Sequence, residues 1–207
     1  MFARVSRVSA SPDKLDENVE FYEQKLLPQI RNLPGFIGAA ALGDRASGRG
    51  AAVTYWSDAE AMRASEATAT AGRGQTAERG VTTLDIQRYE LVIVERVAPA
   101  AANVFVRSNE LDAAVDKLED SITFVRDKVV PNVRSQKGFR GALMGVDRQT
   151  GHCMVSSIWE TAADLEASEA AVSAQRREAG NVAGADNVRV ERYEVMYAEM
   201  KQPVTAG

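Results

Sequence analysis

The 207-residue sequence contains one cysteine, Cys153, and one histidine, His152. A single cysteine excludes an internal disulfide framework and is typical of a reducing compartment. With one cysteine and one histidine in the chain, a zinc site of the usual kind lacks its ligands, and we expect no metal. The two residues are adjacent in a predicted strand and therefore point to opposite faces, so they cannot form a catalytic dyad.

Long apolar runs and basic clusters are also missing. No apolar run approaches the roughly 18 residues of a membrane span, and residues 1–7 lack the apolar core of a signal peptide. The net charge is −4 with a pI near 5.2, and lysine and arginine do not gather into a block. Nucleic-acid binding requires a basic patch. We therefore expect a cytoplasmic protein with neither a membrane nor a nucleic acid as partner.

The sequence does contain an internal repeat. Residues 35–66 and 138–169 align without a gap and agree at 12 of 32 positions, always 103 residues apart. The shared residues include Gly, Phe, Asp, Arg and Trp, which seldom coincide by chance. The chain is therefore predicted to be a tandem duplication, with one domain at 1–97, a linker at 98–103 and a second domain at 104–200.

Each repeat is predicted to fold as β-α-β-β-α-β. Repeat 1 is expected to form a strand at 3–10, a helix from 13 to about 30, strands at 36–42 and 51–56, a helix at 59–71 and a strand at 81–97. Pro28 should kink or end the first helix, and Ser57 and Glu60 have the spacing of a capping box. Repeat 2 is expected to follow the same plan, with a strand from Val104, a helix from about Leu111, a hairpin at Asp147-Arg148, a strand to Trp159, a helix at 162–178, a last strand at 187–200 and a disordered tail.

A four-stranded sheet with helices on one face leaves its other face bare, and two such sheets can cover each other. The fold class predicted is α+β, with two ferredoxin-like repeats packed as an intramolecular dimeric α+β barrel. The long last strands are suited to extending onto the neighbouring sheet. This arrangement is an internal pseudo-dimer, and further homo-oligomerisation is possible.

Several motifs resemble the antibiotic biosynthesis monooxygenase family of the dimeric α+β barrel group. They are Pro34-Gly35-Phe36, the Asp-Arg-x-Ser/Thr-Gly hairpin, a strand ending in Trp and an Ala- and Glu-rich helix after it. The resemblance covers residues 2–97 and 104–200. It implies a pocket for a small apolar or aromatic molecule between sheet and helices in each repeat.

The resemblance implies a cofactor-independent monooxygenase that acts on a small aromatic or quinone-like molecule, with no cofactor. One alternative is a non-catalytic small-molecule binding or stress-related protein of the same fold. A weaker alternative is a haem-binding or haem-degrading protein. In that branch of the family the second helix carries a haem-ligating histidine, whereas residues 59–71 and 162–178 contain no histidine.

No catalytic constellation can be assigned from the sequence. The candidate substrate-binding residues are Trp56, Trp159, Arg88, Arg192 and Tyr55. An indole could stack on a planar substrate, or it could close the core where strand meets helix. Each arginine shares a strand face with a glutamate two residues on. It could therefore pair across the junction of the two sheets or bind an anionic substrate.

Overall fold

The computed structural model describes residues 1–185 and 189–201. The predicted start of the last strand at Asn187 and the tail after Lys201 lie outside the described residues. The described part divides into two compact units. Unit 1 comprises residues 1–88, 100–103 and 193–201, and unit 2 comprises residues 89–99, 104–185 and 189–192. Each unit therefore contains a segment from the end of the other repeat.

Unit 1 is built on an antiparallel sheet. Its strands are β1 (Phe2–Ser9), β2 (Phe36–Gly43), β3 (Arg49–Trp56), the second half of β8 (Arg189–Met200) and a further strand segment at residues 82–88. β3 pairs with β1 at Val5↔Val53 and with β2 at Ala40↔Val53. β2 pairs on its other side with β8, where Ala40 lies opposite Ala198. The last strand of repeat 2 thus completes the sheet of unit 1.

Unit 2 repeats this arrangement. Its strands are β5 (Phe105–Asp112), β6 (Phe139–Val146), β7 (His152–Trp159), the second half of β4 (Thr82–Arg96) and residues 189–192 of β8. Residues 90–96 of β4 pair antiparallel with β6. The hydrogen-bonded order β1-β3-β2-β8-β5-β7-β6-β4 closes on itself as a barrel. The predicted class, α+β with two ferredoxin-like repeats in an eight-stranded barrel, is confirmed.

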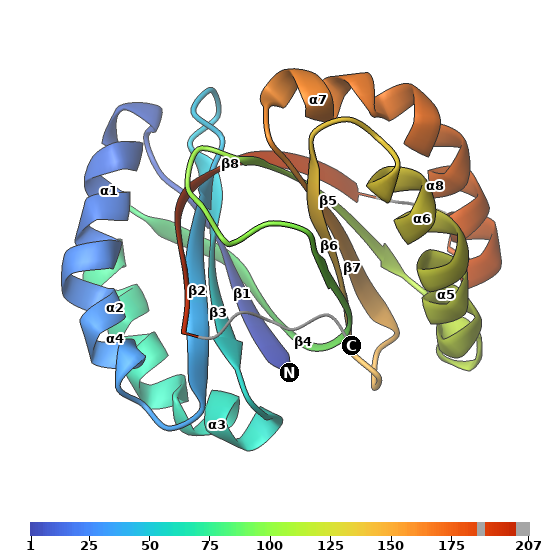
Figure 1. The fold of residues 1–207 in the computed structure, drawn as a ribbon. Coiled ribbons are helices and arrows are strands. Elements are labelled where there is room, and N and C mark those ends of the chain that lie inside the picture. The colour runs from blue at the N-terminus through green and yellow to red at the C-terminus, as the bar shows by residue number, and fades with distance from the viewer. Residues whose placement is uncertain (186–188, 202–207) are drawn as a thin grey trace. The chain divides into compact units, whose positions relative to one another are not determined.

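The first helical segment of each repeat covers one face of its sheet (Figure 1). In unit 1 it consists of a 3₁₀ turn (Pro12–Lys14), α1 (Leu15–Phe21), a π-helical stretch (Tyr22–Leu26) and α2 (Leu27–Arg31). In unit 2 it consists of Val115–Lys117, α5 (Leu118–Phe124), Val125–Val129 and α6 (Val130–Arg134). Pro28 and Pro131 therefore do not end the helix. The π-helical stretch before each proline accommodates the missing N–H and the chain stays helical.

The second helical segment of each repeat is broken at a buried serine. Its parts are α3 (Ala59–Ala64) and α4 (Glu66–Ala77) in unit 1, and α7 (Ala162–Ala167) and α8 (Glu169–Ala183) in unit 2. The N-terminal cap of α3 differs from the predicted capping box. Asp58 is the N-cap and accepts a hydrogen bond from the Ala61 backbone N–H, whereas Ser57 donates to the Asp58 carboxylate.

Two further boundaries differ from prediction. α4 continues past Gly72 to Ala77, and Gly72 is buried in its interior on the side of Leu26. In repeat 2, Leu111 lies in strand β5, and the helical segment begins only at Val115. The apolar Leu111 belongs to the period-two pattern of a buried strand rather than to the stripe of the helix that follows.

Candidate functional site: a cavity and an arginine network in each unit

Unit 1 contains a cavity of about 130 Å³ between its sheet and its helices. Alternate residues of β1, namely Arg4, Ser6 and Val8, line it from the sheet. Leu26 and Ile30 of the first helical segment contribute apolar walls. A single buried water needs roughly 10–15 Å³ by the same kind of measure, so this cavity has room for several waters or a small ring.

Unit 2 contains a smaller cavity of about 70 Å³ in the corresponding place. Arg107, Asn109 and Leu111 of β5 line it at the positions equivalent to Arg4, Ser6 and Val8. The pocket expected between sheet and helices is therefore present in both units. Both are apolar spaces beside a buried arginine.

The arginine of the first strand is almost completely buried in each unit. Arg4 is 2% exposed and donates to the Ser65 hydroxyl at 2.7 Å and to the Met62 carbonyl. Arg107 is 1% exposed and donates to the Ser168 hydroxyl at 2.9 Å and to the Leu165 carbonyl. In each unit the arginine thus supplies a hydrogen-bond donor to a backbone carbonyl and to the serine hydroxyl at the point where the second helical segment is broken. Burial lowers the pKa of Arg4, but guanidinium groups remain charged in proteins.

Glu66 joins three arginines of unit 1. Its carboxylate lies 3.3 Å from Arg4, 2.6 Å from Arg73 and 2.8 Å from Arg88. Burial of Glu66 opposes ionisation, but hydrogen bonds from Arg88 and Arg73 and the charge of Arg4 outweigh it and lower the pKa of Glu66 to about 2. One carboxylate thus holds three guanidinium groups, and the cluster carries excess positive charge.

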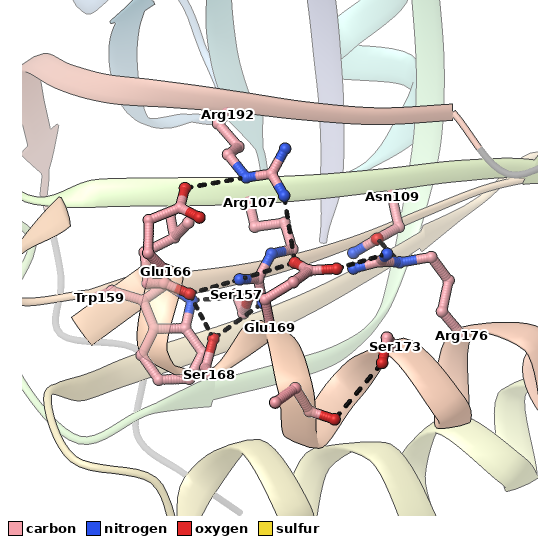
Figure 2. A network of polar contacts seen from close by, with 12 residues as sticks. Arg107, Asn109, Ser157, Trp159, Glu166, Ser168, Glu169, Ser173, Arg176 and Arg192 are labelled. Carbon is pink, nitrogen blue, oxygen red and sulfur yellow. Dashed lines mark hydrogen bonds and ion pairs between the residues drawn. The ribbon is translucent and has the colours of Figure 1, made fainter. Parts of the chain in front are cut away.

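Unit 2 has the matching network, which Figure 2 shows. Glu169 contacts Arg107 at 3.2 Å, Arg176 at 2.8 Å and Arg192 at 3.1 Å. Hydrogen bonding from Arg176 lowers the pKa of Glu169 despite partial burial. Glu166 supplies a second carboxylate 3.3 Å from Arg192. The duplication has kept three arginines and one central glutamate in both units.

Not every donor in these networks is used. Among the described residues, the Nε–H of Arg4 and that of Arg107 are buried without a hydrogen-bond partner. Both arginines also line their cavities. A buried donor without a partner is costly, and in a native protein it needs an explanation. A ligand oxygen in the cavity would supply the missing acceptor.

The two tryptophans predicted to bind substrate lie in the core. Trp56 and Trp159 are fully buried and pack edge-to-face on Phe36 and Phe139 at centroid distances of 5.7 and 6.0 Å. Each indole N–H donates to a cavity-lining hydroxyl, Thr54 at 3.0 Å or Ser157 at 2.9 Å. Each tryptophan is therefore joined to its cavity wall through one hydrogen bond. Direct contact between a tryptophan and substrate stays a prediction.

The other predicted site residues are placed differently. Tyr55 is buried on the strand face opposite to that of Trp56. Arg88 and Arg192 belong to the two arginine networks through Glu66 and Glu169. Their partners are thus helix carboxylates rather than residues of a sheet–sheet junction.

The strand glutamates that follow these two arginines also have partners. Glu90 pairs with the hairpin arginine Arg148 at 2.6 Å, and Glu194 pairs with the hairpin arginine Arg45 at 2.7 Å. Each hairpin arginine is about half exposed, and ion pairs of this kind contribute little to stability. The arginine and the glutamate of one strand face therefore belong to separate ion pairs.

Cys153 and His152 are not a reactive pair. Cys153 is fully buried, and burial raises the pKa of its thiol to about 11, so it is a thiol at neutral pH. The His152 ring contacts Asp112 through Nδ1 at 2.5 Å and stacks on Tyr89. Both residues serve packing at the start of β7.

Strand patterns alone do not reveal the two residues at the centre of each site. Arg4 and Arg107 stand in short strands that alternate polar and apolar residues, and such a pattern normally places polar side chains in solvent. Glu66 and Glu169 align within the repeat, which by itself assigns them no role. The available signal is the repetition, because Arg4, Glu66 and Arg73 each recur 103 residues later.

The sequence is similar to two mycobacterial proteins. No protein-family model matches the sequence. The uncharacterized proteins Rv2557 and Rv2558 of Mycobacterium tuberculosis are similar, at 25% identity over 203 residues and 26% over 204 residues. Each alignment covers 98% of this chain, with 91% of the first relative and 86% of the second.

Solved structures are similar over nearly the whole chain. A proposed monooxygenase from Lactobacillus acidophilus superimposes with a TM-score of 0.70 at 11% identity, covering 97% of this chain and 96% of its own. An anthrone oxidase-like protein gives 0.70 at 13% identity, covering 99% and 95%. The chain has the fold of proteins related to antibiotic biosynthesis monooxygenases. A heme-degrading enzyme from Listeria monocytogenes shares it at a TM-score of 0.56 and 8% identity, covering 93% and 99%.

Membrane-spanning helices and metal clusters are both absent from the described residues. No helix in this part of the chain is both long enough and apolar enough to span a bilayer. The same residues hold no group of three or more His, Cys, Asp or Glu side chains arranged to bind a metal ion.

Proposed function

We propose that this protein is a cofactor-independent oxygenase that acts on a small, flat aromatic or quinone-like molecule. The observation that carries the proposal is the unpaired Nε–H of a buried arginine beside an apolar cavity. An apolar cavity favours an aromatic ring, and a buried cation favours an oxygen anion on that ring. Fold neighbours that are proposed monooxygenases and an anthrone oxidase-like protein support the same reaction class.

The residues would act on the substrate rather than on oxygen. A phenol or anthrone that loses a proton becomes an electron-rich anion, which is the form that reacts with O₂. The guanidinium of Arg4 or Arg107 would stabilise that anion beside the apolar wall of the cavity. Oxidation of an anthrone CH₂ group by O₂ yields the quinone carbonyl and one water, so the reaction needs no external reductant.

Oxygen uptake with 1,8-dihydroxyanthrone tests this function. We expect consumption of one O₂ for each quinone formed, well above the rate without protein. Replacing both buried arginines (Arg4→Met with Arg107→Met) should lower the rate by about 100-fold, as expected for loss of a preorganised charge. Arg45→Met, at an exposed hairpin arginine, is the control and should keep the rate.

The alternative of a non-catalytic binder gives a different result in the same experiment. Such a protein would bind 1,8-dihydroxyanthraquinone, yet it would consume no oxygen above the background. That outcome would reject the oxygenase and retain the binding function.

Haem handling is not favoured by the residues of the two cavities. In the part of the chain that the structure describes, no histidine lines either cavity. The chain's one histidine lies at the start of β7, bonded to Asp112. We expect haem titration to produce no Soret shift; a sharp shift at one haem per chain would contradict this.

A further inference from the structure

The two cavities differ at matched positions of the duplication. Tyr22 and Asn18 line the cavity of unit 1, and the residues 103 positions later are Val125 and Ser121. Valine offers no polar group. The Ser121 hydroxyl donates to the Lys117 carbonyl at 2.9 Å, so its hydrogen is already used. Only unit 1 presents a phenol and an amide to its cavity at these positions.

Both of these groups are buried without a partner. Tyr22 is 9% exposed, and neither its hydroxyl nor the Asn18 amide nitrogen has a hydrogen-bond partner within residues 1–185 and 189–201. Burial, reinforced by nearby Tyr197 and Glu199, raises the pKa of Tyr22, which keeps the phenol protonated and able to donate. An acceptor oxygen on a bound ligand would satisfy both groups and remove their desolvation cost.

Side-chain volume separates the cavities further. Ala41, Ala52 and Ala69 line the cavity of unit 1, and their counterparts in unit 2 are Met144, Val155 and Val172. These larger side chains account for the smaller space, about 70 Å³ against about 130 Å³. The cavity of unit 2 has been partly filled by its own side chains.

The two cavities also differ in how many of their polar groups are already hydrogen-bonded and in their charge. In unit 2 the Asn109 carbonyl oxygen accepts from Arg176 Nε at 2.9 Å, whereas unit 1 has the shorter Ser6 in place of Asn109. Unit 2 also adds Glu166 to its network, and the matched position in unit 1 is Arg63. The unit 1 site is therefore the more positive of the two and favours an anionic ligand more strongly.

We infer that substrate binds in the cavity of unit 1, and that Tyr22 and Asn18 donate hydrogen bonds to its oxygen. The ligand class is a flat aromatic molecule with an ionisable phenol or enol, bound as the anion. The cavity of unit 2 does not bind substrate, and unit 2 has a structural role. This inference rests on the proposed function for its substrate class, and it assigns that function to one of two duplicated sites.

Plugging one cavity at a time tests the assignment. Ala69→Phe fills the cavity of unit 1 and Val172→Phe fills that of unit 2, at positions matched by the 103-residue offset. The probe is 1,8-dihydroxyanthraquinone, followed by calorimetry for stoichiometry and by its visible absorption for ionisation. We expect one probe per chain, binding lost in Ala69→Phe and kept within threefold in Val172→Phe.

Two milder variants test the donors themselves. Tyr22→Phe and Asn18→Ala should each weaken binding about tenfold, as expected for loss of one hydrogen bond to a charged acceptor. Each should also reduce the shift of the visible band toward the ionised form. Ser121→Ala, at the matched position of unit 2, should change neither quantity. Far-ultraviolet circular dichroism confirms that each variant is folded.

Two probes per chain, binding that survives Ala69→Phe, or loss of binding only in Val172→Phe would each overturn the inference. Unchanged affinity in both Tyr22→Phe and Asn18→Ala would overturn the role of the donors. Oxygen uptake is measured on the same variants. Uptake that is lost only in Val172→Phe would reject the assignment to unit 1 and keep the oxygenase, whereas binding in unit 1 without uptake would reject only the oxygenase.

Discussion

At the scale of single residues, Glu66 provides the negative charge that allows three buried or half-buried arginines to lie close together. Burial lowers the pKa of the nearly inaccessible Arg4, and the charges of Arg88 and Arg73 lower it further. A buried cation is very costly without a compensating anion. Removing the carboxylate would leave like charges facing one another, so Glu66 holds the site together as well as setting its charge.

Glu66→Gln should therefore change how stability depends on pH. The pKa of Glu66 is about 2 in the folded protein and roughly 4.3 in an unfolded chain. A lowered folded pKa gives stability that is complete above the unfolded value and is lost as pH falls toward the folded one. We expect Glu66→Gln to flatten the fall in Tm between about pH 5 and pH 2, and to cost about 2 kcal/mol at pH 7. The exposed Glu60→Gln is the control; an equal flattening there would refute the role of Glu66.

A single substitution distinguishes a structural role of Trp56 from a substrate-binding role. Trp56→Phe removes the bond to Thr54 and leaves space beside Phe36. We expect a loss of about 2 kcal/mol in the free energy of unfolding, with affinity for 1,8-dihydroxyanthraquinone changed less than threefold. Urea unfolding and calorimetry measure the two effects. A large loss of affinity at unchanged stability would instead make Trp56 a substrate contact.

At the scale of elements, α4 forms one wall of the unit 1 cavity through a glycine. Gly72 is buried in the helix interior, where glycine costs stability relative to alanine. A Cβ at this position would meet the Leu26 methyl groups at 3.7 and 3.8 Å, which is ordinary contact. The glycine thus enlarges the cavity at the expense of helix stability.

Gly72→Ala should then stabilise the protein and narrow the cavity. We expect a gain of about 0.5–1 kcal/mol from helix propensity, together with a several-fold loss of probe affinity. The matched control is Gly74→Ala on the same helix, where a Cβ would meet nothing within 4 Å. It should give a similar gain and leave affinity unchanged. Equal affinities for the two variants would show that α4 does not limit the cavity.

The elements also show what the sequence could and could not predict. Apolar periodicity and the 103-residue offset were sufficient for the strands and for the duplicated α+β plan. Pro28 was expected to end or kink its helix, yet the helix continues past it to Arg31. A local rule does not reveal that the preceding π-helical stretch accommodates the proline. Arg4 was missed for a similar reason. Its burial is made possible by Ser65, Met62 and Glu66, which lie about 60 residues away in sequence.

At the scale of the whole molecule, the duplication matters because each unit is completed by a strand from the other repeat. Residues 90–96 of β4 pair with β6, and residues 194–200 of β8 pair with β2. A β2 strand without β8 would expose a row of unpaired backbone groups, which promotes association with another chain. Ion pairs reinforce the exchange, since Arg31 binds Glu199 at 2.8 Å and Arg134 binds Glu95 at 2.9 Å.

A chain limited to residues 1–97 should consequently be unable to complete its own sheet as a monomer. It retains the second half of β4, which in the full chain pairs with β6, and it lacks the strand that pairs with β2. Two such chains could exchange these strands with each other. We expect light scattering after size-exclusion chromatography to show a homodimer that dissociates and unfolds together on dilution, because folding and association are then linked. The intact chain should have a concentration-independent Tm over the same range. A stable, folded monomer of residues 1–97 would mean that the exchanged strands are dispensable and that the duplication was not needed to complete either sheet.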